Sequence, residues 1–446
     1  MKDARLHSAR ARAVEQLQRI EVDRAFVGFA GEGEAPLDAR AERQLREYVA
    51  GVTRWRRRLD FLLAHFYRGD FEAMEPTLRQ ILRVGLYDLL YLDTPPHAAL
   101  NEAVELAKRK VRPGAGGLVN GVLRAVLRAK DRLPQPSDAD PAEALAIRYS
   151  HPSWLVRRWI ERYGPADTEA LLQWNNERPV YGVRVNTLKN TVRAFTGLLD
   201  DAGVPWTPSP YLDPFVRVSQ LQPILRSGWL GEGRCAVQDE SAGLVVRLLD
   251  PQPGETLLDA CAAPGGKALF AAARMENRGR VLAFDLHEGR LGLAARAADD
   301  QGVTILTTEA ADLRALARRE EAPQADRVLL DAPCSGLGVL AKRADLRWHR
   351  APEEIGQLAR LQDELLDAAA ACVRPGGVLV YSTCTIEPDE NQARIAPFLE
   401  RHPAFEVEPA VRWLPEEVVT PEGFMATLPH RHRMDGAFAA RLVRRG

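Results

Sequence analysis

The stretch ETLLDACAAPGGKALFAAARM (255–275) decides the fold. Its apolar beginning predicts a buried strand, and its Ala- and Leu-rich end predicts a helix. Between them, small residues and the adjacent Gly265 and Gly266 allow the backbone to approach a ligand closely where the helix begins. The spacing is neither G-x-G-x-x-G nor a phosphate-binding P-loop, because Lys267 is followed by alanine. Taken alone, the loop is either a cofactor cradle or a tight strand-to-helix turn.

Similar strand patterns recur towards the C-terminus. Four apolar runs follow the first one: RVLAFD (280–285), VTILTTE (303–309), RVLLD (327–331) and GVLVYST (377–383). Helical patterns separate them, and this alternation predicts a Rossmann-like α/β domain with a mostly parallel sheet and helices on both faces. Ligands of such sheets bind beyond the carboxyl ends of the strands, so polar residues there are the candidates for chemistry.

The rest of the chain predicts additional domains. Residues 5–132 carry apolar positions at helical spacing without a convincing strand, and LPQPSDADP (133–141) has the composition of a linker. A mixed region follows, in which VYGVRVNTL (180–188) alternates like a strand. The predicted architecture is multidomain, with an all-α domain (1–134), a linker (135–145), a small α+β subdomain (146–232) and the α/β domain (233–446).

Charge leaves nucleic-acid binding open. The 446 residues carry a net charge of −1, which by itself argues against a nucleic-acid binder. Residues 1–134, however, hold 24 Lys and Arg against 18 Asp and Glu. Part of this excess lies in two clusters, 54–58 and 108–112. Such clusters either contact phosphates or form a solvated helix face.

Cysteine usage and hydropathy narrow the class of protein. The five cysteines, an odd number without any CxxC, predict neither a disulfide framework nor a zinc site, and no metal is expected. Cys372 lies in the helical run LLDAAAACV and is expected to be a buried apolar residue. No apolar run approaches the ~20 residues that span a bilayer, and the basic N-terminus lacks a signal-peptide core. We therefore expect a cytoplasmic protein without membrane contact.

Acidic residues end three successive strands or follow them closely. Asp259 ends the first, Asp285 ends the second and Asp312 follows the third. Asp285 is placed to accept hydrogen bonds from ribose hydroxyls. Asp312 either accepts from an adenine amino group or caps a helix. The set suits a nucleoside-containing cofactor but does not distinguish nicotinamide from S-adenosylmethionine.

Two cysteines follow the fourth and fifth strands. Cys334 comes after Asp331-Ala-Pro, and Cys384 comes after Ser-Thr. A thiolate that attacks carbon 6 of cytosine makes carbon 5 able to accept a methyl group. Asp331 is placed to hydrogen-bond the base edge and stabilise the charge that develops on the ring. A base must then remove the carbon 5 proton, and a second thiol, or a water that it positions, could assist this step.

These residues carry a resemblance to a known family. Residues 233–446 resemble the 5-methylcytosine RNA methyltransferases of the NOL/NOP2/Sun group in the order and spacing of VQDESAG (237–243), DACAAPGGK (259–267), DAPCSGLGVL (331–340), DLRW (345–348) and YSTCTIEPDEN (381–391). The resemblance implies Cys384 as the nucleophile, Cys334 as the residue that assists product release, and RNA rather than DNA as the substrate. It also implies contacts with S-adenosylmethionine by Cys261, Ala262, Ala263, Pro264, Gly265, Gly266, Lys267, Asp285, Asp312 and Asp331.

The N-terminal part has a resemblance of its own. Residues 79–108 and 117–128 resemble a NusB-like helical RNA-binding domain, and YSHPSWLV (149–156) resembles the junction that follows it in bacterial members acting on 16S ribosomal RNA. The combination implies a cytosine of 16S ribosomal RNA as the substrate, and we expect a monomer. Transfer RNA as substrate and a non-catalytic RNA-binding factor are the alternatives, and the two intact cysteine motifs favour an enzyme. One departure is Ala437, where the family usually has a phenylalanine.

Overall fold

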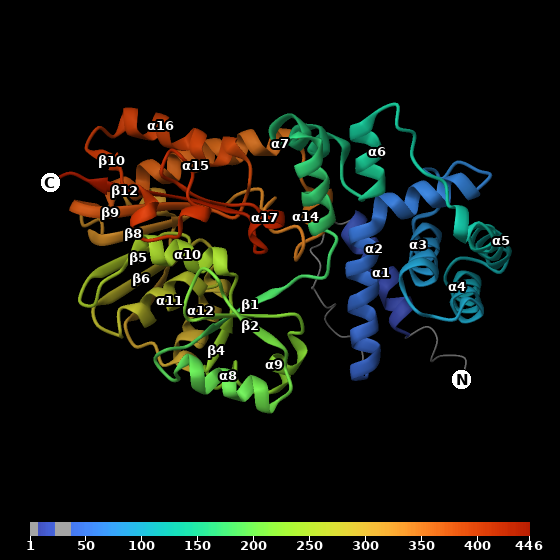
Figure 1. Ribbon diagram of the computed structural model, residues 1–446, viewed down its shortest axis with the longest axis horizontal. Helices are drawn as coiled ribbons and strands as arrows, with labels where there is room; N and C mark the ends of the chain where they lie inside the picture. Colours follow the sequence, from blue (N-terminus) through green and yellow to red (C-terminus); the bar gives the residue numbers. More distant parts are fainter. Residues whose placement is uncertain (1–7, 23–36) are drawn as a thin grey trace. The chain divides into compact units, whose positions relative to one another are not determined.

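The computed structural model describes residues 8–22 and 37–446 (Figure 1). The chain divides into two compact units: Met1–Glu177 with Lys342–Arg350, and Arg178–Ala341 with Ala351–Gly446. Residues 1–7, part of the basic N-terminal stretch considered above, lie outside the described residues. Among the residues that are described, no helix is both long and apolar enough to cross a membrane.

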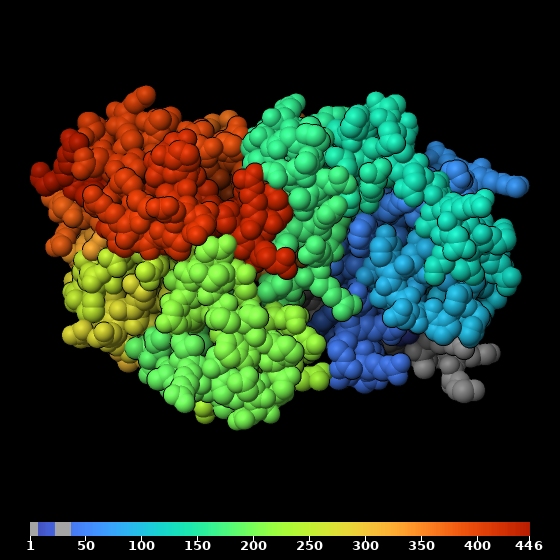
Figure 2. Space-filling model, viewed as in Figure 1, coloured from blue at the N-terminus to red at the C-terminus, as the bar shows by residue number. Residues whose placement is uncertain are grey.

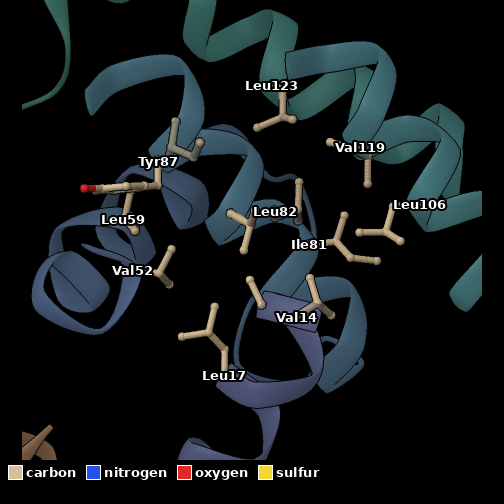
Figure 3. Packing of buried hydrophobic residues seen from close by; sticks show 14 of the residues in the cluster. Val14, Leu17, Val52, Leu59, Ile81, Leu82, Tyr87, Leu106, Val119 and Leu123 are labelled. Carbon is tan, nitrogen blue, oxygen red and sulfur yellow. The ribbon is translucent and has the colours of Figure 1, made fainter. Parts of the chain in front are cut away.

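The first unit is helical, as its apolar spacing predicts. Its first five helices are α1 (Ala9–Val22), α2 (Ala39–Phe66), α3 (Pro76–Tyr91), α4 (Pro96–Lys110) and α5 (Ala115–Arg128). Side chains from all five meet in one apolar core, where Leu17, Leu59, Leu82, Leu106 and Leu123 point towards one another (Figure 3). Within 8–22 and 37–132 there is no strand, which confirms the all-α prediction for the described residues.

A segment distant in sequence completes this unit. Helices α6 (Pro141–Arg148), α7 (Ser153–Trp174) and α14 (Leu346–His349) belong to it. The fully buried guanidinium of Arg347 donates hydrogen bonds to Ser150 O at 3.1 Å and to Asn175 O at 3.1 Å. It also donates to Asn176 Oδ1 at 2.9 Å. The DLRW motif therefore packs with the helices, although its sequence neighbours belong to the second unit.

The second unit begins with a small antiparallel sheet in the order β2-β3-β1-β4. Its strands are β1 (Tyr181–Val185), β2 (Trp206–Pro208), β3 (Phe215–Val218) and β4 (Cys235–Val237), and the helices α8 (Val192–Asp201) and α9 (Gln222–Arg226) lie between them in sequence. Phe195 of α8 and Ile224 of α9 are buried in the same core as Val183 and Val216 of the sheet. The strand predicted within 180–188 is β1.

The larger sheet has the order β10-β12-β9-β8-β5-β6-β7, with β11 paired to β12. Its parallel strands are β5 (Thr256–Asp259), β6 (Arg280–Asp285), β7 (Leu306–Ala310), β8 (Ala325–Asp331) and β9 (Val373–Thr383). All five predicted strands are confirmed. Antiparallel pairing around β12 extends this sheet, through β10 (Phe405–Val407), β11 (Met425–Thr427) and β12 (Ala437–Arg444).

Helices cover both faces of the larger sheet. They are α10 (Glu240–Leu249), α11 (Gly266–Arg274) and α12 (Glu288–Gln301) on one face, and α13 (Leu313–Leu316), α15 (Pro352–Ala371) and α16 (Gln392–Arg401) on the other. Adjacent strand residues enter opposite cores, since Leu257 packs with the first set and Leu258 with the second. Figure 2 shows the red C-terminal segment against the yellow-green segment that contains α10, where Asp435 N donates to Asp239 Oδ1 at 3.1 Å.

Candidate active site

The loop between β5 and α11 has a shape that only glycine permits at one position. Gly265, where α11 begins, has φ of 101°, in the left-handed region. A Cβ built there would lie 2.6 Å from Cβ of Ala294 in the neighbouring α12. At Gly266 the nearest atom to such a Cβ, Nε2 of Gln238, is 3.7 Å away. Gly265 is therefore required for the tight turn from β5 into α11 and its packing against α12. Close approach of this loop to a ligand stays a prediction.

Asp285 and Asp312, the two acidic residues predicted to bind a nucleoside, both accept hydrogen bonds from backbone N–H groups. Asp285 accepts a hydrogen bond from Ala263 N at 3.1 Å through Oδ2 and from His287 N at 3.0 Å through Oδ1. Asp312 caps α13 by accepting from Arg314 N at 2.9 Å, and it forms an ion pair with the guanidinium of Arg314 at 2.7 Å. Each carboxylate keeps lone pairs for a ligand, since its two oxygens can accept about four hydrogen bonds.

Several carboxyl groups lie close together near the loop between β5 and α11. Burial, and then the charge of Asp331, raise the pKa of Asp259 to about 7. Its Oδ1 is buried without a hydrogen-bond partner. Burial, followed by the charges of Asp259, Asp331, Asp285 and Asp312, also raises the pKa of Cys261 well above its ordinary value. Cys261 is therefore a protonated thiol surrounded by carboxylates, and these acids together favour a ligand that carries positive charge and hydrogen-bond donors.

One lysine reaches into this acidic region. Lys267 Nζ lies 2.6 Å from Asp331 Oδ2, and Ser382 donates a hydrogen bond to Asp331 Oδ1 at 2.8 Å. Burial opposes the charge of Lys267, but Asp331, and then Cys384 and Asp259, outweigh it and raise the pKa of the ammonium. The pair links α11 to the ends of β8 and β9. Ser382 was not singled out from the sequence, although it stands within the YSTCT motif.

The two cysteines meet in space. Cys334 Sγ and Cys384 Sγ lie 3.4 Å apart, just beyond β8 and β9. Cys384 is exposed and Cys334 is partly buried. The hydrogen bond to Cys384, then burial, raise the pKa of Cys334 well above its ordinary value. A raised pKa favours the protonated form of Cys334, and at 3.4 Å either sulfur can donate its S–H to the other. Cys372 is buried in the sheet core, as predicted, and Cys235 is buried within the small subdomain.

These features fit S-adenosylmethionine, a cation with ribose hydroxyls and an adenine amino group. The Asp259 carboxyl has a buried oxygen without a partner, and Asp285 and Asp312 offer acceptors. Asp331 connects the two parts of the site. It accepts a hydrogen bond from Lys267 at the start of α11 and another from Ser382, two residues before Cys384. The arrangement brings the acidic region and the two cysteines together at one edge of the sheet.

Known proteins resemble this chain over its whole length. The chain is 34% identical over 98% of its length to the probable ribosomal RNA small subunit methyltransferase B of Bacillus subtilis (strain 168), which it covers to 99%. It is 36% identical over its full length to the whole ribosomal RNA small subunit methyltransferase B of Salmonella arizonae. The chain belongs to the ribosomal RNA small subunit methyltransferase B family. Family models match as well: the NusB family (7–128), the ferredoxin-like domain of RsmF/B-like methyltransferases (151–224) and the 16S rRNA methyltransferase RsmB/F (246–443).

Solved structures confirm the fold of this small subunit methyltransferase B family member. A protein described as PH0851 superposes with a TM-score of 0.78 at 31% identity, covering 91% of this chain and 90% of that one. A methyltransferase homologue from Pyrococcus horikoshii has a TM-score of 0.58 at 26% identity, and the match covers 69% of this chain and 99% of that one. The predicted order of domains along the chain is confirmed: a NusB domain, a small α+β subdomain and a methyltransferase domain.

In this family member, side chains of the basic cluster 54–58 form contacts within the helical unit. Arg57 pairs with Glu143 at 2.5 Å and Arg56 lies 3.3 Å from Glu21. Arg58 is buried. These three side chains therefore bind acids and carbonyls of the helical unit, and contact of the 54–58 cluster with phosphates stays a prediction.

The second basic cluster, 108–112, lies on the surface. Lys108 pairs with Glu105 at 2.8 Å, and Arg112 pairs with Glu75 at 3.0 Å. The side chain of Arg112 is 61% exposed, so solvent screens its ion pair and the guanidinium is accessible to a polyanion. A surface cluster of this kind can exchange its carboxylate partners for phosphates.

Proposed function

We propose that this chain transfers a methyl group from S-adenosylmethionine to carbon 5 of a cytosine in 16S ribosomal RNA. The reaction proceeds through a covalent bond between Cys384 and carbon 6 of the base. The observation that carries the proposal is the pair of sulfur atoms, Cys334 Sγ and Cys384 Sγ, 3.4 Å apart at the edge of the cofactor region. Membership of the methyltransferase B family and the NusB domain support RNA as the substrate.

The first step is attack by the exposed thiolate of Cys384 on carbon 6. A bond forms between sulfur and carbon, and the electron pair of the 5,6 double bond moves so that carbon 5 becomes nucleophilic. Asp331, held by Lys267 and Ser382, hydrogen-bonds the base edge where charge develops. S-adenosylmethionine, when bound, supplies an electrophilic methyl group.

Release requires the reverse elimination. A base takes the proton from carbon 5, the double bond re-forms, and Cys384 leaves as a thiolate. The S–H of Cys334, 3.4 Å from that sulfur, stabilises the leaving thiolate by a hydrogen bond. Since Cys334 keeps its proton, it does not compete with Cys384 for carbon 6. The two cysteines thus act at different steps.

Methyl transfer from labelled S-adenosylmethionine tests the proposal. The purified chain is incubated with small-subunit RNA from cells that lack it, with transfer RNA as the parallel substrate, and the product nucleosides are identified by mass spectrometry. We expect 5-methylcytidine in 16S RNA alone. Label in transfer RNA alone moves the substrate to that class. Absence of label from every RNA, free or assembled, overturns the enzyme in favour of a non-catalytic RNA-binding factor.

A further inference from the structure

A buried glutamate lies behind the cysteine pair without a role in the reaction described above. Glu390 ends the short helix η2 (Pro388–Glu390) and is fully buried. Its carboxylate accepts hydrogen bonds from Ser335 N at 2.8 Å and from Gln362 Nε2 at 3.1 Å through Oε1. Through Oε2 it accepts from Ser335 Oγ at 2.5 Å. No Lys or Arg of the described residues forms an ion pair with it, so neutral donors alone hold this group.

These donors belong to the two loops that carry the cysteines. Ser335 follows Cys334 directly, and Thr385 follows Cys384. Ser335 Oγ and Thr385 Oγ1 lie 2.8 Å apart. Because the Ser335 hydroxyl donates to Glu390, it accepts from Thr385, and Thr385 in turn accepts from Glu387 N at 3.3 Å. A directed chain of hydrogen bonds therefore joins both loops and ends on the Glu390 carboxylate.

Asn391, which follows Glu390 in the sequence, holds the Cys384 loop through hydrogen bonds on both sides of that cysteine. Thr383 Oγ1 donates to Asn391 Oδ1 at 2.5 Å, and Asn391 Nδ2 donates to Thr385 O at 3.0 Å. The residues on either side of Cys384 are thus bound by one amide. Glu390 itself is held through its backbone, since the Tyr381 hydroxyl donates to Glu390 O at 2.5 Å. All of these groups are buried, so water does not replace them.

We propose that Glu390 is a positioning residue that sets the separation of the two cysteine sulfurs by binding Ser335 and, through Ser335, Thr385. The role deepens the proposed function, on which it rests. Removing the carboxylate frees the loop after Cys334 without touching the cofactor loop or the Lys267–Asp331 pair. The step that depends on both sulfurs, product release, then slows more than methyl transfer does.

The sulfur separation is tested by oxidation, which requires no RNA. Diamide accepts two electrons and two protons from the paired thiols, forming one disulfide and leaving the reduced hydrazine. Intact mass after alkylation follows the formation of the Cys334–Cys384 disulfide. We expect Glu390→Gln to slow disulfide formation by about 10- to 100-fold, because the loops lose hydrogen bonds to a buried charged group. Thr385→Val removes a neutral hydrogen bond and should slow it less, by about 10-fold at most. Glu400→Gln, on the exposed end of α16, is the matched control and should match the wild type.

Kinetics then separate positioning from loss of fold. In Glu390→Gln the first turnover and S-adenosylmethionine binding should remain near the wild type, whereas steady-state turnover falls and the covalent RNA adduct accumulates. Disulfide formation as fast as in the wild type, in both variants, overturns the proposal. Equal loss of binding, first turnover and steady state also overturns it, because it marks a merely structural residue. If the wild type methylates no RNA, the proposed function fails, while the oxidation result still decides the sulfur geometry.

Discussion

Substitution of Gly265 by alanine tests the geometry of the loop between β5 and α11. Two other glycines, Gly254 and Gly266, provide separate controls. Gly265 combines a φ of 101° with a Cβ position 2.6 Å from Cβ of Ala294. Gly254 has a φ of 93° with open space around it, and Gly266 has neither a positive φ nor a neighbour closer than 3.7 Å. The three alanine variants therefore separate backbone strain from steric overlap. The conformational freedom that alanine removes from the unfolded chain is common to all three.

The magnitudes follow from these geometries. A Cβ in the left-handed region costs about 1–2 kcal/mol, and forcing an extra methyl against a packed helix costs about 1–3 kcal/mol. We expect Gly265→Ala to lower the free energy of unfolding by about 2–5 kcal/mol, and Gly254→Ala by the strain component alone. Gly266→Ala should not be destabilised.

Chemical denaturation followed by circular dichroism measures the three variants, and calorimetry measures their affinity for S-adenosylmethionine. We expect Gly265→Ala to be the least stable and to bind S-adenosylmethionine more weakly than Gly254→Ala does. The loop geometry described here is refuted if Gly265→Ala unfolds at the same denaturant concentration as Gly266→Ala and keeps wild-type affinity.

Three further predictions concern the acidic region and the thiols. Cys384→Ala should abolish methyl transfer while calorimetry finds S-adenosylmethionine binding unchanged; full activity would overturn the assignment of the nucleophile. Cys334→Ala should accumulate a covalent enzyme–RNA adduct on a denaturing gel, and free turnover without adduct would remove its role in release. The folded protein binds the Asp259 proton more tightly than the unfolded chain does, so stability falls as the pH rises from 3.8 to about 7. Asp259→Asn should remove that fall in urea titrations, gaining stability relative to the wild type between about pH 5 and pH 8; parallel curves would contradict the raised pKa.

Much of the fold could be predicted because the informative residues are local. The parallel strands are continuous Val- and Leu-rich runs buried on both faces, as in RVLLD (327–331), and such runs are recognisable without knowledge of their neighbours. The position of β12 next to β9 could not be predicted, because pairing between Ala440 and Tyr381 depends on contacts between residues far apart in sequence. The same holds for Arg347, which is buried among residues almost two hundred positions away.

The candidate site divides in the same way. Cys334 and Cys384 were predictable because strand ends of a parallel sheet share one edge, whereas their separation depends on side chains that look unremarkable in sequence. Glu390 stands in EPDEN, a run that resembles a solvated turn, and only the packing of Ser335 and Gln362 around it shows a buried carboxylate. The ion pairs of the basic cluster 54–58 could not be predicted for a related reason, since the acid that pairs with Arg57, Glu143, lies on another helix.

The central claim is that Cys384 forms the bond to carbon 6, and trapping that bond tests it most directly. A 16S RNA fragment with 5-fluorocytosine at the methylated position allows attack and methyl transfer but blocks release, because fluorine cannot leave carbon 5 as a proton. Digestion and mass spectrometry of the resulting adduct identify the attached residue. We predict an adduct on the peptide that contains Cys384 and none on the peptide that contains Cys334. An adduct on Cys334, or methylated RNA formed without any adduct, would contradict the account.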